Sequence, residues 1–145
     1  MDDPLYRKEI LRLAANAAGA GRLAHPTASA TLFNPACGDR VTVDVMLANG
    51  RITALAHHTN ACVLTPASAA ILGADAVGLN RDEIMTLAAA VEALLAGSGT
   101  PRAPFDSYAA FDGLVPHKPR HACVLLPLRA ALEAMEILEL SEPGA

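Results

Sequence analysis

The stretch from residue 41 to residue 60 constrains the fold most strongly, because it has the pattern of a β-hairpin. Apolar and polar side chains largely alternate on both sides of Asn49-Gly50, as in strands with one face against a core. Asn and Gly both tolerate the positive φ of a two-residue hairpin turn. We therefore predict two antiparallel strands here, and the alternation that begins at Thr31 predicts a third. The alternating apolar positions are Val41, Val43, Val45, Leu47, Ile52, Ala54 and Ala56.

Helices are predicted before and after these strands in the sequence. Their bounds follow from capping side chains and prolines at the start, and from glycines near the end. Thr65 with Pro66 is interpreted as an N-cap followed by the first helical residue. Pro127 either begins the last helix or kinks a longer one. The expected helices cover residues 5–18, 65–73, 80–96 and 125–140.

Strands followed by helices predict an α+β fold, with a small three-stranded antiparallel sheet covered by helices. The length of 145 residues fits a single domain over residues 1–145. The core must be closely packed, because 31 of the residues are alanine and none is tryptophan. Residues 97–119 are rich in proline and glycine, and their Phe105, Tyr108 and Phe111 predict a loop with a buried hydrophobic anchor, which can include a short helical turn.

Charge and composition exclude several classes of function. A formal net charge of −4 lacks the positive field that nucleic acids require. No stretch reaches the ~20 apolar residues of a membrane helix, and the first residues lack the basic and apolar regions of a secretory signal. We therefore expect a cytoplasmic protein without a nucleic acid or membrane partner. Neither a nucleophile elbow nor a glycine-rich phosphate loop is present.

The three cysteines, Cys37, Cys62 and Cys123, are far apart in the sequence. An odd number in a reducing compartment argues against a disulfide framework and for thiols that react or bind a ligand. The sequence around Cys62, ACVLTP, recurs around Cys123 as ACVLLP. Each cysteine thus lies four residues before a proline, on the approach to a predicted helix N-terminus, which favours the thiolate. The alternative interpretation is a chance recurrence in an Ala- and Leu-rich chain.

The segment Asn34-Pro-Ala-Cys37-Gly38-Asp39 is predicted to be a turn between two strands. Such a turn can direct the sulfur of Cys37 and the carboxylate of Asp39 to the same space, which Cys62 reaches at the end of the returning strand. Three thiols and a carboxylate suit Zn²⁺ or an iron–sulfur cluster with one labile position. The alternatives are that the cysteines are small buried hydrophobic residues and that Asp39 is only a turn residue.

These motifs together resemble the NifU/IscU-type iron–sulfur cluster assembly scaffolds. The resemblance rests on the segment 34–39, on Cys62 followed by Ala67-Ser68, on Cys123 before the last helix, and on Leu5-Tyr6 near the N-terminus. It covers essentially the whole chain. It implies a small antiparallel sheet covered by helices, with the ligands clustered at one exposed end.

The resemblance also implies a function and a site. Cys37, Cys62 and Cys123 would bind iron or a labile [2Fe-2S] cluster, with Asp39 as a further ligand. The expected partner is a cysteine desulfurase, followed by iron–sulfur carrier or recipient proteins. The protein would then be a scaffold or sulfur acceptor rather than a conventional turnover enzyme.

The long interval between Cys62 and Cys123 is similar to the SufU-type branch, in which an insertion corresponds to part of residues 97–119. Arg120 matches an arginine typical of that branch, while Ala122 stands where the family has histidine or lysine. His121 is therefore a candidate fourth ligand, because residues i and i+2 of an extended segment face the same side.

Cys123 is the candidate sulfur acceptor, because it adjoins the proline-rich segment and because Lys118 and Arg120 would favour its thiolate. Two alternatives to the scaffold stay open at this point. One is a zinc-bound SufU-type sulfurtransferase partner of a cysteine desulfurase, and the other is a non-catalytic structural zinc module. Thiolates bind both zinc and iron, so the residues alone leave the metal undecided.

Overall fold

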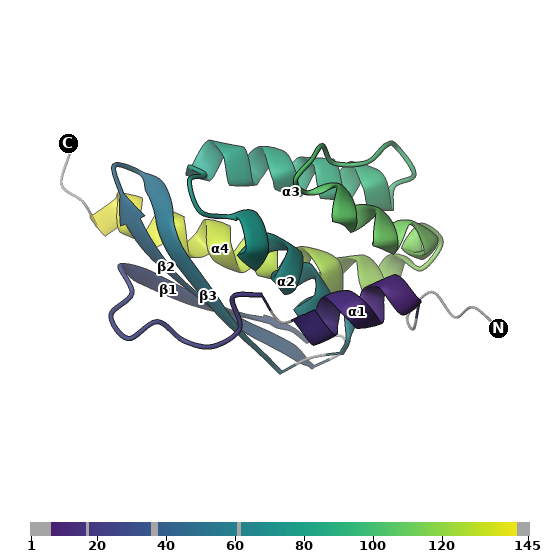
Figure 1. Cartoon of the computed structure of the whole chain (residues 1–145), viewed down its shortest axis with the longest axis horizontal. Helices are drawn as coiled ribbons and strands as arrows, with labels where there is room; N and C mark the ends of the chain where they lie inside the picture. Colours follow the sequence, from purple (N-terminus) through teal and green to yellow (C-terminus); the bar gives the residue numbers. More distant parts are fainter. Residues whose placement is uncertain (1–6, 17, 36–37, 61, 142–145) are drawn as a thin grey trace.

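The computed structural model describes residues 7–16, 18–35, 38–60 and 62–141. Within these residues a sheet of three strands lies against four α-helices and two 3-10 helices (Figure 1). None of the helices in these ranges is long and apolar enough to cross a membrane. In chain order the elements are α1 (Lys8–Asn16), β1 (Ala28–Asn34), β2 (Asp39–Ala48), β3 (Arg51–Asn60), α2 (Leu64–Asp75), α3 (Arg81–Leu95), η2 (Asp106–Leu114), η3 (Lys118–Arg120) and α4 (His121–Ser141).

The sheet has the predicted antiparallel topology, with the strands in the order β1-β2-β3. Val43 at the centre of β2 lies opposite Ala30 of β1 and His57 of β3. The turn between β2 and β3 has Asn49 at φ 54° and Gly50 at φ 76°, the positive angles of a type I′ hairpin turn. The predicted α+β fold with a small three-stranded sheet is confirmed.

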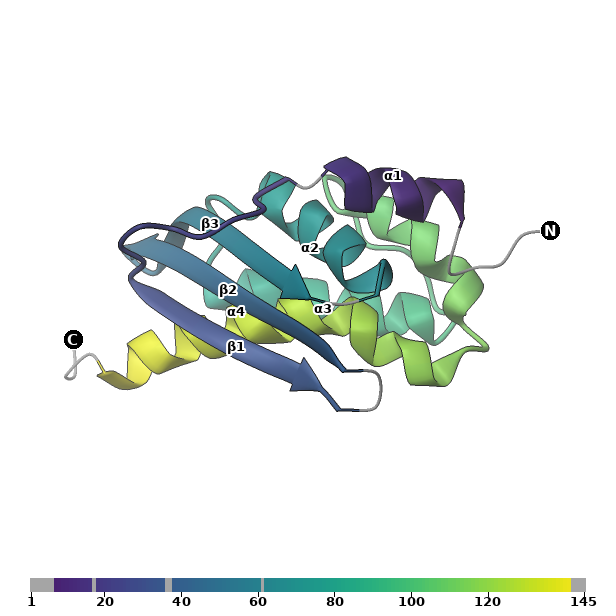
Figure 2. The same cartoon turned by 90° about the horizontal axis from the view of Figure 1, so that it is seen from below.

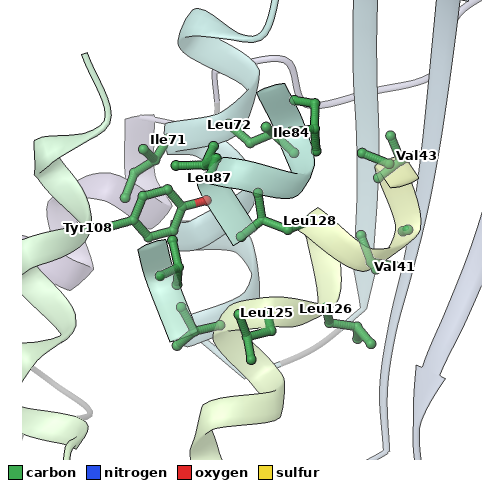
Figure 3. Packing of buried hydrophobic residues seen from close by; sticks show 14 of the residues in the cluster. Val41, Val43, Ile71, Leu72, Ile84, Leu87, Tyr108, Leu125, Leu126 and Leu128 are labelled. Carbon is green, nitrogen blue, oxygen red and sulfur yellow. The ribbon is translucent and has the colours of Figure 1, made fainter. Parts of the chain in front are cut away.

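One face of the sheet carries the core, and α4 lies along it from end to end (Figure 2). Helix α2 packs between α1 and α4, and α3 packs on α4 and η2. Val41 and Val43 of β2 are fully buried, and Leu126 and Leu128 of α4 share the cluster with them (Figure 3). Because many of the other core residues are alanines, the helices and the sheet pack on small side chains, as predicted.

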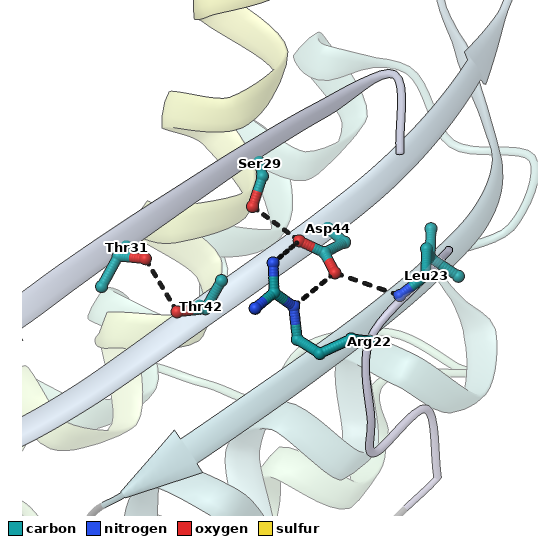
Figure 4. Close-up of polar contacts among 6 residues, drawn as sticks. All are labelled: Arg22, Leu23, Ser29, Thr31, Thr42 and Asp44. Atoms are coloured by element: carbon teal, nitrogen blue, oxygen red, sulfur yellow. Dashed lines mark hydrogen bonds and ion pairs between the residues drawn. The ribbon is translucent and has the colours of Figure 1, made fainter. Parts of the chain in front are cut away.

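A connection over residues 18–27 crosses the opposite face of the sheet and covers Asp44 of β2. The Asp44 carboxylate accepts hydrogen bonds from the Arg22 guanidinium at 2.7 and 3.1 Å, from the Leu23 amide and from the Ser29 hydroxyl (Figure 4). Burial alone raises the pKa of Asp44, but these donors outweigh it and hold the pKa below its usual value. This buried carboxylate is thus a structural anchor for the connection.

The predicted end of α2 is wrong because of a contact from a distant part of the chain. Gly73 does not end α2, which continues to Asp75. A Cβ at Gly73 would collide with the carbonyl oxygen of Ala18. The glycine is therefore needed for a close approach between α2 and the connection after α1, and it does not mark a helix end.

Helix α4 begins at His121, four residues before the predicted start, and Pro127 lies inside it. Of the two interpretations given for Pro127, the longer helix is the right one. The predicted N-cap pair Thr65-Pro66 is likewise shifted, because α2 begins at Leu64 and its N-terminus has no side-chain cap. Asn80 and Glu83 form a capping box at the start of α3, in agreement with the helix predicted over residues 80–96.

Residues 97–119 contain η2 and the first residues of η3, so this segment has the helical turn expected within it. Phe105, Tyr108 and Phe111 are all buried, as predicted for a hydrophobic anchor. The hydroxyl of Tyr108 donates to the carbonyl of Ser68 on α2 at 3.1 Å. The insertion is therefore fixed to α2, the helix whose N-terminus follows Cys62.

Candidate functional site

Three of the predicted ligands meet at one end of the sheet, although they come from three separate parts of the chain. Asp39 begins β2, Cys62 lies between β3 and α2, and Cys123 is in the first turn of α4. One carboxylate oxygen and the two sulfurs lie within 4.8 Å of one another. Cys37, the remaining predicted cysteine, lies outside the described residues.

The turn that precedes Asp39 is formed as predicted. The amide of Gly38 donates to the carbonyl of Asn34 at 2.8 Å, and Gly38 has φ 71°, which a side chain would strain. This closed turn brings the end of β1 and the start of β2 together beside the two sulfurs. Asn34 and Gly38 thus close the turn that the sequence predicts between the two strands.

Asp39 is almost fully buried, with 1% of its surface exposed, and it is bonded to residues after β3. Its Oδ1 accepts from the amide of Cys62 at 3.0 Å. Its Oδ2 lies 3.6 Å from the Cys62 sulfur and 3.3 Å from the hydroxyl of Thr65. The carboxylate therefore fixes the backbone of one cysteine and also faces its sulfur, which a turn residue would not do.

Cys62 is half-buried and lies at the N-terminus of α2. Its pKa is lowered from about 9 to about 6, first by a hydrogen bond from Cys123 and then by the amides of Leu64 and Thr65. Burial and the negative charge of Asp39 oppose this shift. At neutral pH the sulfur is thus mainly thiolate, the form that attacks sulfur and binds metals.

Cys123 is completely buried. Its sulfur lies 3.7 Å from the side-chain amide nitrogen of Asn34 at the end of β1. Cys123 is the predicted sulfur acceptor because it adjoins the proline-rich segment, but in the structure it is in the first turn of α4 with 0% of its surface exposed. Its role as sulfur acceptor stays a prediction, but of the two described cysteines Cys62 is the more accessible.

His121 is not brought to the cluster. Its Nε2 lies 2.7 Å from the carbonyl oxygen of Leu114, so the ring holds the end of η2. The reason given for His121 as a ligand was an extended segment, whereas residues 121 and 123 are helical, and helical residues two apart do not face each other. Arg120 ends η3, and Lys118 begins it.

The group of Asp39, Cys62 and Cys123 has the chemistry of a metal site. Thiolates bind zinc and iron, and a carboxylate completes tetrahedral zinc sites or supplies an exchangeable ligand to iron. A carboxylate and an ionised thiol this close to each other are mutually repulsive, so a bound cation would stabilise both. Helices α2 and α4 also direct their N-termini here, which favours negative charge at this place.

A cleft and a buried histidine lie away from these three ligands. A cleft of about 600 Å³ between α1 and η2 is lined by Arg7, Arg12 and Asp106 among others, and by no cysteine. His57 is buried in β3 with its Nε2 2.8 Å from the carbonyl oxygen of Ala18. Burial lowers the pKa of His57, and its contact with Ala18 is structural.

Sequence reasoning missed two residues that contact the cluster, Thr65 and Asn34. Thr65 was interpreted as a helix cap and Asn34 as part of a turn motif. Thr65 instead contacts Asp39 and the carbonyl of Cys123, and Asn34 contacts the Cys123 sulfur. The signal in the sequence that could have indicated the role of Thr65 is Pro127. If the last helix includes Pro127, no amide of residue 127 can donate to the Cys123 carbonyl, so another group has to.

Comparison with known proteins places this arrangement in a family. Residues 5–112 match the model of the NifU-like N terminal domain. No curated protein matches the chain. A crystal structure of a nitrogen-fixing NifU-like protein (N-terminal) from Brucella abortus superimposes with a TM-score of 0.90 at 31% identity, over 97% of this chain and 98% of that one.

Two more distant structures share the fold. A hypothetical protein has a TM-score of 0.81 at 22% identity, over 91% of this chain and 97% of that one. A protein from Fervidobacterium islandicum, named as a candidate iron–sulfur cluster assembly scaffold for the SUF system, has a TM-score of 0.81 at 18% identity, over 90% of this chain and 96% of that one. The family match and the Brucella relative together show that the chain belongs to the NifU-like N-terminal domain family.

Proposed function

We propose that this protein is an iron–sulfur cluster assembly scaffold that accepts sulfur from a cysteine desulfurase and holds iron or a labile [2Fe-2S] cluster through Cys37, Cys62 and Cys123, with Asp39 as a fourth ligand. The observation that carries the proposal is the convergence of Asp39, Cys62 and Cys123, whose ligand atoms lie within 4.8 Å of one another. Family membership supports it. The name of the SUF-system structure, which shares the fold, agrees with it.

Sulfur acceptance requires a thiolate that a partner can reach. The thiolate attacks the outer sulfur of the persulfide on the desulfurase, a new S–S bond forms, and the desulfurase thiolate leaves as the old S–S bond breaks. Cys62 meets both needs among the described cysteines, because it is half-buried and its pKa is about 6. Cys123 would act after Cys62, since its sulfur is buried.

The ligand set also explains how cargo could leave again. Thiolates bind iron strongly, whereas a carboxylate is a harder and more exchangeable ligand. Asp39 would therefore be the position from which a cluster is passed to carrier or recipient proteins. We place this activity in the cytoplasm, where reducing conditions keep the three thiols available.

The experiment is anaerobic assembly with ferrous iron, cysteine, a cysteine desulfurase and a dithiol that reduces persulfide sulfur to sulfide, followed by visible absorption. Mass spectrometry of each cysteine is done on a parallel sample without iron and without the dithiol. We expect a cluster on the unaltered protein and none on Cys62→Ser or Cys123→Ser. Asp44→Asn is the matched control for Asp39→Asn, because Asp44 is also a buried carboxylate but lies away from the sulfurs. Assembly that survives loss of Cys62 or Cys123 would exclude that cysteine from the site.

Zinc is the second candidate, and the burial of the ligands favours it. Asp39 is 1% exposed and Cys123 is fully buried, as in closed zinc sites. The protein would then be a zinc-bound SufU-type sulfurtransferase partner, or a structural zinc module if no thiol accepts sulfur. Persulfide on a cysteine of a zinc-loaded protein without any cluster would establish the former, and zinc with neither persulfide nor cluster the latter.

A further inference from the structure

We propose that Thr65 is a positioning residue of this site: its hydroxyl joins the carbonyl of Cys123 to the carboxylate of Asp39, and Pro127 makes that link necessary. The inference deepens the proposed function and rests on it, since it takes Asp39 and Cys123 as ligands. Thr65 is the second residue of α2 and is completely buried. It is three residues from Cys62, so one short segment supplies both a ligand and the group that places two others.

Pro127 creates the need for a donor from another helix. In an α-helix the amide of residue 127 would donate to the carbonyl of residue 123, but proline has no N–H. A buried carbonyl that loses its donor destabilises the fold unless another group donates to it. The Cys123 carbonyl accepts from the Thr65 hydroxyl at 3.0 Å. The start of α4 is therefore held by a side chain of α2 at the residue that carries the sulfur.

The next carbonyl of α4 also accepts a hydrogen bond from a hydroxyl of α2, one turn further along that helix. The carbonyl of Val124 accepts from the Ser68 hydroxyl at 2.6 Å. Thr65 and Ser68 are three residues apart, which places them on one side of α2, and both are fully buried. The two hydroxyls on α2 therefore bind two consecutive carbonyls of α4, in the turn that precedes Pro127.

Only Thr65 of this pair also contacts a predicted ligand outside α4. Its hydroxyl oxygen lies 3.3 Å from Oδ2 of Asp39. A hydroxyl has one proton to donate, so the carbonyl at 3.0 Å and the carboxylate at 3.3 Å share it. The Thr65 hydroxyl oxygen thereby sets the distance between the Asp39 carboxylate and the Cys123 backbone. In this way it positions the Asp39 oxygen and the Cys123 sulfur as ligands for a cation.

The two hydroxyls differ in what they do, so positioning of the ligands can be tested separately from stabilisation of the fold. Ser68 stabilises α4 without touching Asp39 or a cysteine side chain in the contacts described, whereas Thr65 does both tasks. Pro127→Ala supplies an amide that can donate to the Cys123 carbonyl, so it can replace one of the two contacts of Thr65. It cannot replace the contact with Asp39.

The test uses the full chain with Zn²⁺ and Co²⁺ as probes, in Thr65→Val, Thr65→Ser and Ser68→Ala. We expect Thr65→Val to weaken Zn²⁺ binding by about 10- to 100-fold, the usual effect of losing a group that orients a ligand. It should also change the Co²⁺ absorption spectrum. Thr65→Ser should restore both, and Ser68→Ala should unfold at lower urea concentration with the spectrum unchanged.

The double variant Thr65→Val/Pro127→Ala completes the test and remains available if Thr65→Val alone fails to fold. We expect it to regain stability in metal-free protein, because the new amide bonds the carbonyl, but to keep the weakened Zn²⁺ binding. Unchanged Zn²⁺ binding in Thr65→Val, or an equal loss of binding in Ser68→Ala, would overturn the inference. Absence of Zn²⁺ and Co²⁺ binding by the unaltered protein would instead refute the proposed metal site, while the metal-free stabilities still test the Thr65 link.

Discussion

Replacing Gly73 with alanine tests the packing that supports α2, because two opposed effects act at this position. Alanine is favoured over glycine inside a helix by about 1 kcal/mol, so propensity alone predicts a more stable protein. The added Cβ, however, would collide with the carbonyl oxygen of Ala18 and lie 3.3 Å from the Cα of Gly19. These are backbone atoms, which cannot rotate away as a side chain can.

The steric effect should win. Overpacking of a well-packed site costs about 1–3 kcal/mol, and here the connection that must move is also held by His57. The His57 side chain contacts the Ala18 carbonyl at 2.8 Å, and the His57 amide donates to Gly19 at 2.9 Å. We therefore expect Gly73→Ala to lower the free energy of unfolding by about 1–2 kcal/mol, near the upper half of the overpacking range less the propensity effect.

Urea unfolding followed by circular dichroism measures this directly, with Ala74→Gly as the matched control. Ala74 is the next residue of the same helix and is exposed, so the control should lose up to about 1 kcal/mol from propensity alone. A Gly73→Ala variant that is as stable as the unaltered protein, or more stable, would refute the close approach between α2 and the connection at residues 18–19.

Four further predictions follow from the site and its surroundings. In metal-free protein the alkylation rate of Cys62 should be half-maximal near pH 6, because the pKa of Cys62 is about 6. Cys123→Ala removes the hydrogen bond from Cys123 and should move this midpoint upward, and an unshifted midpoint would contradict that hydrogen bond. The pKa of Asp44 is depressed on folding, so its contribution to stability is present above the unfolded value of about 3.9 and is lost as pH falls through the folded one. Asp44→Asn should therefore flatten the decline of unfolding free energy in acid, and a decline as steep as in the unaltered protein would count against this. Asp39→Ala should retain a bound cluster longer but bind zinc more weakly, whereas unchanged release and unchanged affinity would reduce Asp39 to a turn residue. His121→Ala should leave zinc affinity unaltered, and a large loss measured by chelator competition would restore it as a ligand.

The sheet could be predicted because its signals are local. Asn49-Gly50 specifies a hairpin turn, and the alternation on each side indicates which side chains face the core. The structure has β3 from Arg51 to Asn60, which are the bounds expected for it. The capping box of Asn80 and Glu83 is local as well. Neither element needed knowledge of a distant part of the chain.

The bounds of α2 and α4 could not be predicted, because distant contacts decide them. Gly73 indicates a helix end until Ala18 is known to lie against it. Pro127 indicates a helix start until Thr65 is known to donate to the Cys123 carbonyl, for which Pro127 supplies no amide N–H. In both cases a local rule was correct in itself but was overridden by tertiary packing.

The candidate site could be predicted in its composition but not in its geometry. The motif around Asp39 and the spacing of Cys62 and Cys123 pointed to the residues that the structure brings within 4.8 Å. The accessibility of Cys123 and the direction of His121 depended on where α4 begins, so the same helix bound accounts for both errors. The contact with Thr65 depended on that bound as well.

The most direct test of the central claim is metal analysis with visible absorption on protein purified without oxygen, beside Cys62→Ser and Asp44→Asn prepared in the same way. Thiolate ligands at Cys62 and Cys123 predict that the unaltered protein and Asp44→Asn carry iron with the absorption of a cluster, or acquire it on reconstitution, and that Cys62→Ser does neither. A metal-free protein that cannot be reconstituted, or a Cys62→Ser variant that binds as much metal as the unaltered protein, would contradict the claim that Asp39, Cys62 and Cys123 form the site.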